Sequence, residues 1–272
     1  MNKLVIGLIT YNEDIHLERC INNISQLKSP IFILDSFSTD KTKHIASKYN
    51  LNFFESKFVN YSNQRKKLLN IIKANTNVEY VLFLDADEYL SKNLINEVNY
   101  LLKSNNISKF DGYFLKRKFI WKKNWIRYGN YYPRFFMRLA RINKIKLDTK
   151  PVNEHYLCLS KNICYLKHDI VDENLNGVKY WIKKHVRYAR YESMAYFNED
   201  NIKSKKYICY DKLPLIIRVF LYFFYIFFIK KGFFDGFTGS GYHILHSFFY
   251  RMVIDYMIII EILKRKIKNG KQ

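Results

Sequence analysis

The sequence predicts an α/β protein built on a sheet of parallel strands. In the first half of the chain, short runs of consecutive apolar residues alternate with segments that have the apolar spacing of helices. Strands that are apolar throughout are typical of parallel sheets covered by helices on both faces. Ligands bind to such sheets at the carboxyl ends of the strands. Because polar residues directly follow three of the apolar runs, we expect a binding site at that edge.

The elements of the first half follow from these apolar runs and from the residues that end or cap helices. Pro30 cannot continue a helix and therefore separates the first helix from the second strand. Asp40 is placed to accept hydrogen bonds at the start of the second helix. In chain order we predict a strand at 4–9, a helix to about residue 27, a strand at 31–34, a helix at 41–49, a strand at 51–54, a helix from 63 to about 73 and a strand at 80–84.

From Asp111 onward the pattern changes to short strands that predict a mixed sheet. A basic, aromatic loop lies among them, and its Trp121, Trp125 and Tyr131 are candidates either for stacking on sugar rings or for ordinary packing. The predicted elements are strands at 112–115, 135–139, 151–155 and 163–168, and a charged helix from about 178 to 197. We divide the chain into a domain at 1–200, with halves at 1–110 and 111–200, and a helical C-terminal region at 201–272.

The C-terminal region combines apolar helices with basic residues. The segment 215–229 is almost wholly apolar and is interrupted only by Arg218. Its uninterrupted part, 219–229, is shorter than the roughly 20 apolar residues that a membrane span needs. It fits an interfacial helix or a shallow hairpin better, with a buried core helix as the alternative. A second apolar helix is predicted at about 242–263, followed by a basic tail.

The net charge of +22 requires a partner or an explanation from composition. Nucleic acid would use the basic and aromatic residues, and an anionic membrane would attract the basic residues. Drift in an AT-rich genome is a third reading of the Lys, Asn, Ile, Tyr and Phe content. Because the basic residues are scattered in short clusters and no recognition motif accompanies them, we expect a membrane surface and no nucleic acid.

The cysteines and the N-terminus predict a cytoplasmic location. The four cysteines have neither a paired spacing nor histidines at zinc-binding spacing, so we expect reduced thiols. Met1-Asn2-Lys3 leads straight into the first strand, so we expect no secretory signal. With the apolar and basic C-terminal region, these observations predict a protein held peripherally on the inner face of the cell membrane.

The most informative motif is the acidic turn Asp85-Ala86-Asp87-Glu88, which follows the apolar strand at 80–84. Three carboxylates at the end of a buried strand are costly unless positive charge meets them. A divalent cation that carries a diphosphate would do so, because Mg²⁺ and Mn²⁺ take carboxylate and phosphate oxygens. The alternative is that the carboxylates cap the helix that begins near Ser91.

Four segments in order resemble the bacterial family 2 glycosyltransferases, which have the GT-A fold. They are Thr10-Tyr11-Asn12-Glu13, Asp35–Asp40, Asn63-Gln64-Arg65 and Asp85–Glu88. The closest resemblance is to the lipopolysaccharide-core β-glucosyltransferase subgroup, which Pro151-Val152-Asn153-Glu154 and His168 also match. The resemblance implies an α/β fold whose Rossmann-like nucleotide-binding sheet is extended by a mixed sheet.

The resemblance also assigns roles to residues. It implies that Asp87 binds Mg²⁺ or Mn²⁺, that His168 is a further metal ligand or diphosphate contact, and that Glu154 is the catalytic base. A core histidine is the alternative for His168, an ion pair is the alternative for Glu154, and Asp148 and Asp172 are the other candidate bases. The nucleotide-sugar site would comprise Thr10, Tyr11, Glu13, Asp35, Ser36, Arg65, Asp85, Ala86 and Asp87.

Within this site the expected contacts are specific. Asp35 would accept a hydrogen bond from uracil N3–H, and Asp85 would contact the ribose. Arg65, at a helix start, would meet the diphosphate or a base edge, and the alternative for it is a solvated basic face with Lys66 and Lys67. The helix that follows the mixed sheet would line an anionic acceptor site or simply present a solvated face with Lys184, His185, Arg187 and Tyr188.

The predicted function is metal-dependent, inverting transfer of a hexose from a UDP-sugar to a lipopolysaccharide or lipooligosaccharide core. A capsule or protein glycan is an alternative acceptor. A nucleotidyltransferase would carry a glycine-rich phosphate loop after the first strand, where Thr10–Glu13 has no glycine. A non-catalytic nucleic-acid-binding protein would explain the charge but not the carboxylates at the strand ends.

Overall fold

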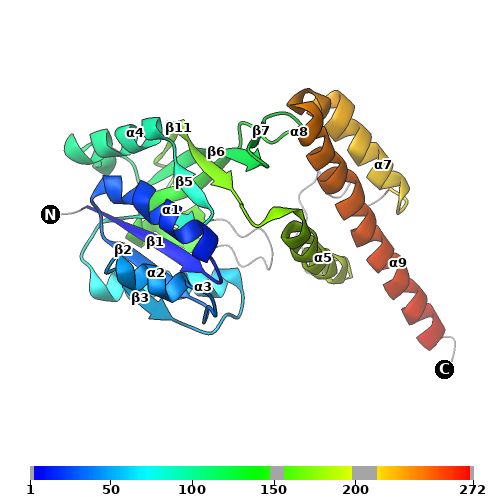
Figure 1. Ribbon diagram of the computed structural model, residues 1–272, viewed down its shortest axis with the longest axis horizontal. Helices are drawn as coiled ribbons and strands as arrows, with labels where there is room; N and C mark the ends of the chain where they lie inside the picture. Colours follow the sequence, from blue (N-terminus) through cyan, green and yellow to red (C-terminus); the bar gives the residue numbers. More distant parts are fainter. Residues whose placement is uncertain (1–2, 148–155, 198–212, 270–272) are drawn as a thin grey trace. The chain divides into compact units, whose positions relative to one another are not determined.

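The structure is a computed structural model and describes residues 3–147, 156–197 and 213–269 (Figure 1). The chain divides into two compact units. The first comprises residues 1–120 and 132–175, and the second comprises residues 121–131 and 176–272. Each unit is described by itself below.

The first unit is built on a mixed sheet whose first half is parallel. Along the sheet the strands follow the order β3-β2-β1-β4-β8-β6-β11-β5. The first four are parallel, β8 runs antiparallel to both neighbours, and β11 is parallel to β6 and antiparallel to β5. The strands are β1 (Leu4–Thr10), β2 (Ile31–Asp35), β3 (Asn52–Glu55), β4 (Tyr80–Asp85), β5 (Glu88–Leu90), β6 (Gly112–Trp121), β8 (Phe135–Arg141) and β11 (Ile163–Glu173).

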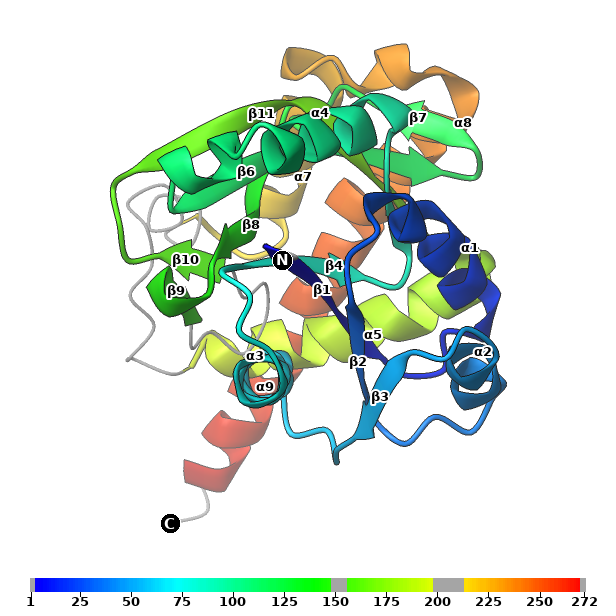
Figure 2. The same ribbon diagram turned by 90° about the vertical axis from the view of Figure 1, so that its left-hand side faces the viewer.

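Helices cover both faces of the parallel half because successive strand residues point to opposite faces. On one face, Leu4, Ile6 and Leu8 of β1 pack in the main core with α1 (Asp14–Ile24), α2 (Thr42–Lys48) and α4 (Lys92–Lys103). On the other face, Val5 packs in a second core with α3 (Tyr61–Asn75). Figure 2 shows a small antiparallel sheet of β9 (Ile145–Leu147) and β10 (Tyr156–Cys158) beside β8. The predicted α/β class and the extension by a mixed sheet are confirmed.

Local hydrogen bonds explain where the helices begin. Asn60 caps α3 by accepting from the Asn63 backbone N–H at 2.8 Å, so the helix begins two residues before the predicted position. Ser91 caps α4 by accepting from the Leu94 N–H at 3.3 Å. The carboxylates of the acidic turn therefore do not cap α4, and that alternative interpretation is wrong. Asp40 accepts from the Thr42 N–H at 2.9 Å at the start of α2, as predicted.

The second unit is helical. It contains α5 (Gly177–Ala195), α7 (Ile217–Phe224), η5 (Gly232–Asp235), α8 (Gly236–His243) and α9 (Tyr250–Asn269), together with the short strand β7 (Asn124–Ile126). The apolar helix of α7 continues to Ile229, and a continuous helix of 36 residues extends over Gly232–Ile267. That second helix is long and apolar enough to cross a membrane, and 33% of its most apolar stretch of 18 residues is buried within the protein.

The two units differ from the domains predicted from sequence. The charged helix α5, which we placed in the domain at 1–200, lies in the second unit because Ala189 packs with Tyr250, Ile254 and Ile258 of α9. The loop at 121–131 also belongs to the second unit. There Trp121 packs against Trp181 at 5.8 Å and Tyr242 at 5.0 Å between ring centroids, so it is a core aromatic.

Candidate functional site

The polar segments that follow the first, second and fourth strands lie side by side. Thr10 is the register partner of Asp35, and Ile9 is the partner of Asp85. The Ser36 backbone N–H donates to the Thr10 carbonyl at 3.0 Å. Since β4, β1 and β2 are neighbours and parallel, their carboxyl ends meet at one edge of the sheet. This is the edge at which we predicted the binding site.

Asp35 is fully buried and is held by residues of the chain itself. Its Oδ1 accepts from the Thr10 hydroxyl at 2.7 Å and from the Ser38 hydroxyl at 2.6 Å. Its Oδ2 accepts from the Ser38 backbone N–H at 2.6 Å. In this arrangement Asp35 ties the end of β1 to the loop after β2. The contact with uracil N3–H stays a prediction, and it requires this hydrogen-bonding network to open.

The loops after β1 and β2 interlock into one structure. The Asn12 backbone N–H donates to the Ser38 hydroxyl at 2.8 Å, and the Asn12 side chain accepts from the Thr39 N–H at 2.8 Å. Two aromatic side chains remain at the surface, because Tyr11 is 56% exposed and Phe37 is 55% exposed. Phe37 was not among the predicted site residues. Together these rings provide flat apolar surfaces of the kind on which a base stacks.

Two carboxylates of the acidic turn are paired with arginines. Asp85 accepts from Arg65 at 3.3 Å and from Arg138 of β8 at 3.0 Å. Arg138 also donates to Glu88, which in turn accepts from the Asp85 backbone N–H at 3.0 Å. We name these four residues, Arg65, Asp85, Glu88 and Arg138, the four-charge cluster. The side chain of Asp85 is 34% exposed, and its contact with the ribose stays a prediction.

Arg65 occupies a different place from the one that we expected. Its guanidinium pairs with Asp85 and lies over the ring of Tyr156, 5.2 Å from the centroid. The residue is 8% exposed. An arginine near the start of a helix is normally well placed to meet phosphate, but Arg65, the fifth residue of α3, forms an ion pair with Asp85 instead. The predicted diphosphate contact of Arg65 stays a prediction.

The four-charge cluster shifts the ionisation of its carboxyl groups. Burial alone would raise the pKa of Asp85, but Arg138 and Arg65 outweigh it and hold that pKa well below its usual range. Burial raises the pKa of Glu88 to about 8 against the attraction of Arg138, with repulsion from Asp85 and Asp172 adding to the rise. Glu88 is 2% exposed, so it stabilises the turn and does not face a ligand.

Asp87 is held by an amide instead of an arginine. Its Oδ2 accepts from the Asn174 side chain at 2.9 Å. Its backbone carbonyl accepts from Arg19 at 3.2 Å and from the Glu173 N–H at 3.1 Å, which fastens the turn to the end of β11. A carboxylate whose charge is not neutralised by an arginine can contribute that charge to a cation.

The residues present fit a metal in part. A Mg²⁺ ion bound with a nucleotide needs one or two carboxylates, because the phosphates and water supply its other ligands. Asp87 can be that carboxylate, whereas Asp85 and Glu88 already pair with arginines. Over residues 3–147, 156–197 and 213–269, no three His, Cys, Asp or Glu side chains gather as a metal cage.

The structure does not bring His168 to Asp87. Asp172 of β11 is the strand-register partner of Glu88 of β5. The Asp169 carbonyl accepts a hydrogen bond from the Ser91 N–H at the start of α4. His168 is four residues before Asp172, which corresponds to roughly 13 Å along a strand. Its backbone N–H donates to Glu97 of α4 at 3.2 Å. The role of His168 as a further metal ligand beside Asp87 stays a prediction.

The remaining predicted residues are placed as follows. Glu13 pairs with His16 at 2.6 Å, the Ser36 hydroxyl accepts from Gln64 at 3.0 Å, and Ala86 is buried. Glu154 and Asp148, the first candidate base and one of its alternatives, lie outside the described residues. Asp172 forms an ion pair with Arg117 at 3.4 Å. On α5, the ring of His185 stacks on that of Trp181 with 3.6 Å between the ring centroids, so His185 is a packing residue.

Sequence reasoning missed several residues that build the site. Arg138 is one of them, and its signal was a single charge within the otherwise apolar stretch 135–139. Arg19 donates to the Glu173 carboxylate at 2.7 Å and holds the acidic turn. His16 is fully buried, and its Nε2 accepts from the Leu175 N–H at 2.8 Å. Neither Arg19 nor His16 had a recognisable signal, since both lie on a helix with partners more than a hundred residues away.

The parallel sheet, its mixed extension and the acidic turn at the strand ends define an α/β domain of the GT-A type. Residues 5–160 match the family model described as "Glycosyl transferase family 2", and the chain belongs to this family. The family predicted from the four segments is therefore confirmed, and the protein is a glycosyltransferase. The lipopolysaccharide-core subgroup stays a prediction.

Two relatives that are matched over most of their length are glycosyltransferases by name. An uncharacterized glycosyltransferase of Rickettsia bellii is 30% identical, over 88% of this chain and 81% of that protein. Another, from Rickettsia prowazekii, is 27% identical over 91% of this chain and 84% of that protein. The chain is also similar to Staphylococcus aureus TarS, named as a poly(ribitol-phosphate) beta-N-acetylglucosaminyltransferase, at 28% identity over 36% of this chain and 18% of TarS. The crystal structure of TarS 1-349 in complex with UDP-GlcNAc aligns with a TM-score of 0.47 and 15% identity, over 97% of this chain and 92% of that chain.

Proposed function

We propose that the protein transfers a hexose from a UDP-sugar, with the help of a divalent cation, to an anionic glycan of the cell envelope. The proposed acceptor is lipid-linked, such as lipopolysaccharide or lipooligosaccharide core, and the proposed location is the inner face of the cell membrane. One observation carries the donor assignment. Asp87, at the carboxyl edge of the parallel sheet, is held by Asn174, whereas its neighbours Asp85 and Glu88 are paired with arginines.

The chemistry is a single displacement at the anomeric carbon. A hydroxyl oxygen of the acceptor forms the new bond to that carbon, while the bond from the carbon to the diphosphate oxygen breaks. The hydroxyl proton goes to a base, for which Glu154 is our candidate, and the base acts from the face opposite to the leaving group. A divalent cation, when bound, neutralises the departing diphosphate. Asp87 would hold that cation, and Asp85 would orient the ribose.

The poly(ribitol-phosphate) named as the acceptor of TarS is a phosphate polymer, and this supports an anionic acceptor for a chain with a net charge of +22. Charge of this kind steers an anionic acceptor towards the protein. A screen of nucleotide sugars by thermal shift in the presence of Mn²⁺ identifies the sugar of the donor.

The Asp87→Ala substitution tests the donor site. We expect it to lower Mn²⁺-dependent hydrolysis or transfer of the UDP-sugar by about 100-fold or more, because metal stabilisation of the leaving group contributes several kcal/mol. The measurement is release of UDP with and without Mn²⁺. Activity that survives the substitution with its metal dependence intact would contradict the proposal.

Glu154→Gln is the matched variant. It removes one negative charge, as Asp87→Ala does, but we expect it to leave UDP and Mn²⁺ binding unchanged and to abolish transfer. Thermal shift with UDP and Mn²⁺ separates the two variants, since only Asp87→Ala is expected to lose the metal-dependent part of the shift. If Glu154→Gln transfers at the normal rate, then Glu154 is not the base.

A further inference from the structure

The second unit carries an apolar surface on the apolar helix 217–229, on η5 and at the start of α8. The exposed apolar side chains of α7 lie at intervals of three and four residues, which places them on one face of the helix. Phe233 and Phe234 of η5 continue the surface, because the Phe233 ring centroid lies 6.4 Å from that of Phe228 and 4.4 Å from that of Phe234. Phe237, at the start of α8, is 97% exposed. We name the following eight residues the phenylalanine face: Ile217, Phe220, Leu221, Phe224, Phe228, Phe233, Phe234 and Phe237.

The inner side of α7 is already occupied within the second unit. Val219 and Ile226 are buried, and Arg218 forms an ion pair with Asp255 of α9 in which both side chains are almost fully buried. The Asp255 carboxylate also accepts from the Ile216 backbone N–H at 2.9 Å. This buried pair fixes which side of α7 points inward, so the phenylalanine face is the outward side of a packed helix.

The charges around the phenylalanine face are basic. Lys230 and Lys231 are exposed at the end of the apolar helix of α7. Within 213–250 the one acidic residue of the sequence is Asp235. Its side chain is 2% exposed and pairs with His243 at 2.7 Å. An apolar surface bordered by lysines complements a bilayer with anionic headgroups, whereas two copies of it would bring like charges together.

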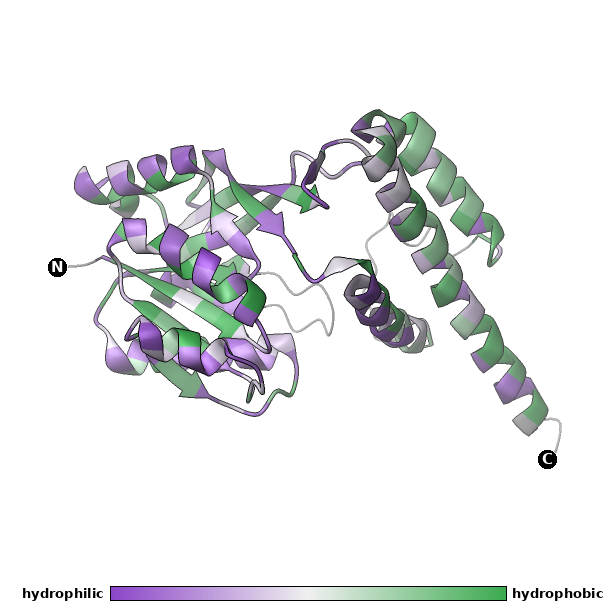
Figure 3. Cartoon of the chain, in the orientation of Figure 1, coloured by the Kyte–Doolittle hydropathy of each residue, from purple (hydrophilic) through white to green (hydrophobic). Residues whose placement is uncertain are grey.

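The helix Gly232–Ile267 has the length of a membrane span, but its packing opposes that role. Its α9 part packs along α5 through Ala189, Tyr250 and Ile254. The outer side of α5 exposes Lys183, Arg187 and Arg190, and Figure 3 shows α5 as much more hydrophilic than α7. A spanning α9 would draw these three charges into hydrocarbon, at a cost of about 2.5 to 3.5 kcal/mol each at the centre of the bilayer.

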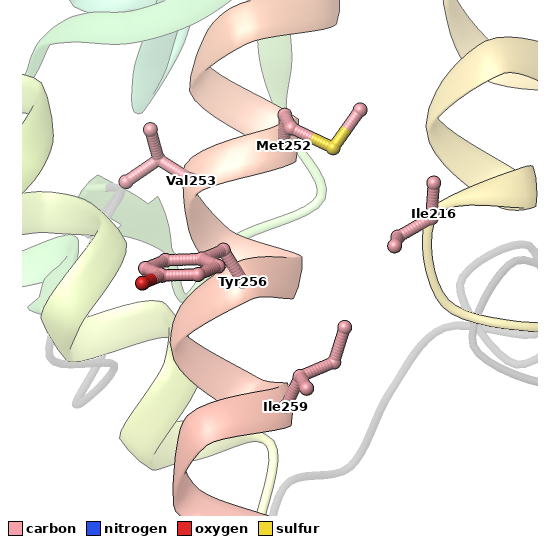
Figure 4. A pocket seen from close by; sticks show the side chains of 5 residues that line it. All are labelled: Ile216, Met252, Val253, Tyr256 and Ile259. Carbon is pink, nitrogen blue, oxygen red and sulfur yellow. The ribbon is translucent and has the colours of Figure 1, made fainter.

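We propose that the second unit binds the surface of an anionic bilayer without spanning it, with the phenylalanine face inserted at the boundary of headgroups and acyl chains. Lys230 and Lys231 would lie at the level of the lipid phosphates. An apolar groove between Ile216 and α9, lined also by Met252, Val253, Tyr256 and Ile259, adds apolar surface next to the start of the face (Figure 4). This inference rests on the proposed membrane location and specifies its surface and its mode.

The test uses the full-length protein and sedimentation with lipid vesicles, in the absence of donor and acceptor. The vesicles are phosphatidylcholine alone or an equal mixture with phosphatidylglycerol. We expect binding to the anionic vesicles, and we expect Phe224→Ser/Phe228→Ser/Phe237→Ser to weaken it by at least about tenfold, because three inserted rings are lost. Val59→Ser/Tyr100→Ser/Leu159→Ser removes three exposed apolar side chains of the first unit and is expected to bind like the wild type.

A second variant covers the case in which the serine variant fails to fold. Lys230→Glu/Lys231→Glu leaves every ring in place, and we expect it to abolish the preference for anionic vesicles. Equal binding by the wild type and both variants would overturn the proposal. So would a serine variant that changes the oligomeric state in sedimentation velocity while its vesicle binding is unchanged, since the face would then bind a second copy.

Alkaline carbonate extraction of membranes from producing cells tests the mode of attachment. Release of the protein supports surface binding, and retention with the lipid would show that the helix spans. Because UDP binding is measured separately by thermal shift on the same variants, failure of this inference leaves the proposed transferase function standing. If the wild-type protein does not bind UDP, the proposed transferase function is contradicted, while the inference about the membrane surface is unaffected.

Discussion

At the scale of residues, the carboxylates of the acidic turn are distinguished by their partners. In the sequence, Asp85, Asp87 and Glu88 are three similar residues within four positions. In the structure, Arg138 donates hydrogen bonds to Asp85 and Glu88, and Asn174 donates one to Asp87. The motif was recognisable from the sequence, but this separation was not, because the deciding residues are 50 and 87 positions away from their partners.

Arg138→Leu is expected to destabilise the first unit strongly. It leaves the buried Glu88 without its arginine and the partly exposed Asp85 with one cation fewer, and breaking a buried ion pair from one side costs about 3–5 kcal/mol. The measurement is the free energy of unfolding in urea. Lys43→Ala, which removes an exposed ion pair with Glu55, is the control and is expected to cost at most about 1 kcal/mol. Equal stabilities of the two variants would show that the four-charge cluster does not hold the turn.

At the scale of elements, the apolar runs predicted the buried strands well and the helix limits less well. The strands β1, β2 and β4 match their predicted runs because residues buried on both faces leave an uninterrupted apolar signal. The helix predicted to begin near residue 242 begins at Gly232 instead. Three glycines at 236, 239 and 241 disfavour helix in isolation. Gly239 is required by packing, because a Cβ there would lie 2.2 Å from the Asp235 Cβ.

The packing of α5 predicts that the second unit loses stability on acidification. Burial beside Trp181 lowers the pKa of His185 to about 4 from its ordinary value of 6.5. An unfolded chain therefore takes up this proton at a higher pH than the folded one. The stability contributed by the neutral ring is complete above pH 6.5 and is lost as the pH falls from about 6.5 towards about 4.

Thermal unfolding between pH 7 and pH 4 (chosen to bracket that range) measures this effect. His185→Gln is expected to flatten the pH dependence of the midpoint, while His44→Gln, at an exposed position of α2, is expected to leave it unchanged. An unaltered pH dependence in His185→Gln would show that other groups account for the acid sensitivity.

At the scale of the whole molecule, the sequence predicted the α/β class and the family from short motifs, while the division into units depended on distant contacts. No local signal showed that the loop at 121–131 would pack with helices more than a hundred positions later, where Tyr131 bonds His246 at 2.9 Å. The same limit applies to the site, since Arg19 and His16 join α1 to the end of β11. Long-range partners of this kind leave no periodic trace in a single sequence.

The net charge of +22 leads to a prediction for the entire chain. Raising salt from about 0.1 M to about 1 M shortens the screening length from about 10 Å to about 3 Å. We expect this change to weaken binding to anionic vesicles several-fold but not to abolish it, because the inserted phenylalanine side chains do not depend on charge. Sedimentation across the salt series measures both parts, and complete release at high salt would show that electrostatic attraction alone holds the protein to lipid.

The four-charge cluster also constrains how the chain can evolve. Arg65, Arg138, Asp85 and Glu88 are joined by hydrogen bonds and ion pairs in a site where an unpaired charge is costly. A lineage that loses one member must therefore compensate at a second position, on another strand or helix, before the first change can be tolerated. Substitution of these four codons is expected to proceed in coupled steps, with apolar pairs of similar volume as the accessible replacement.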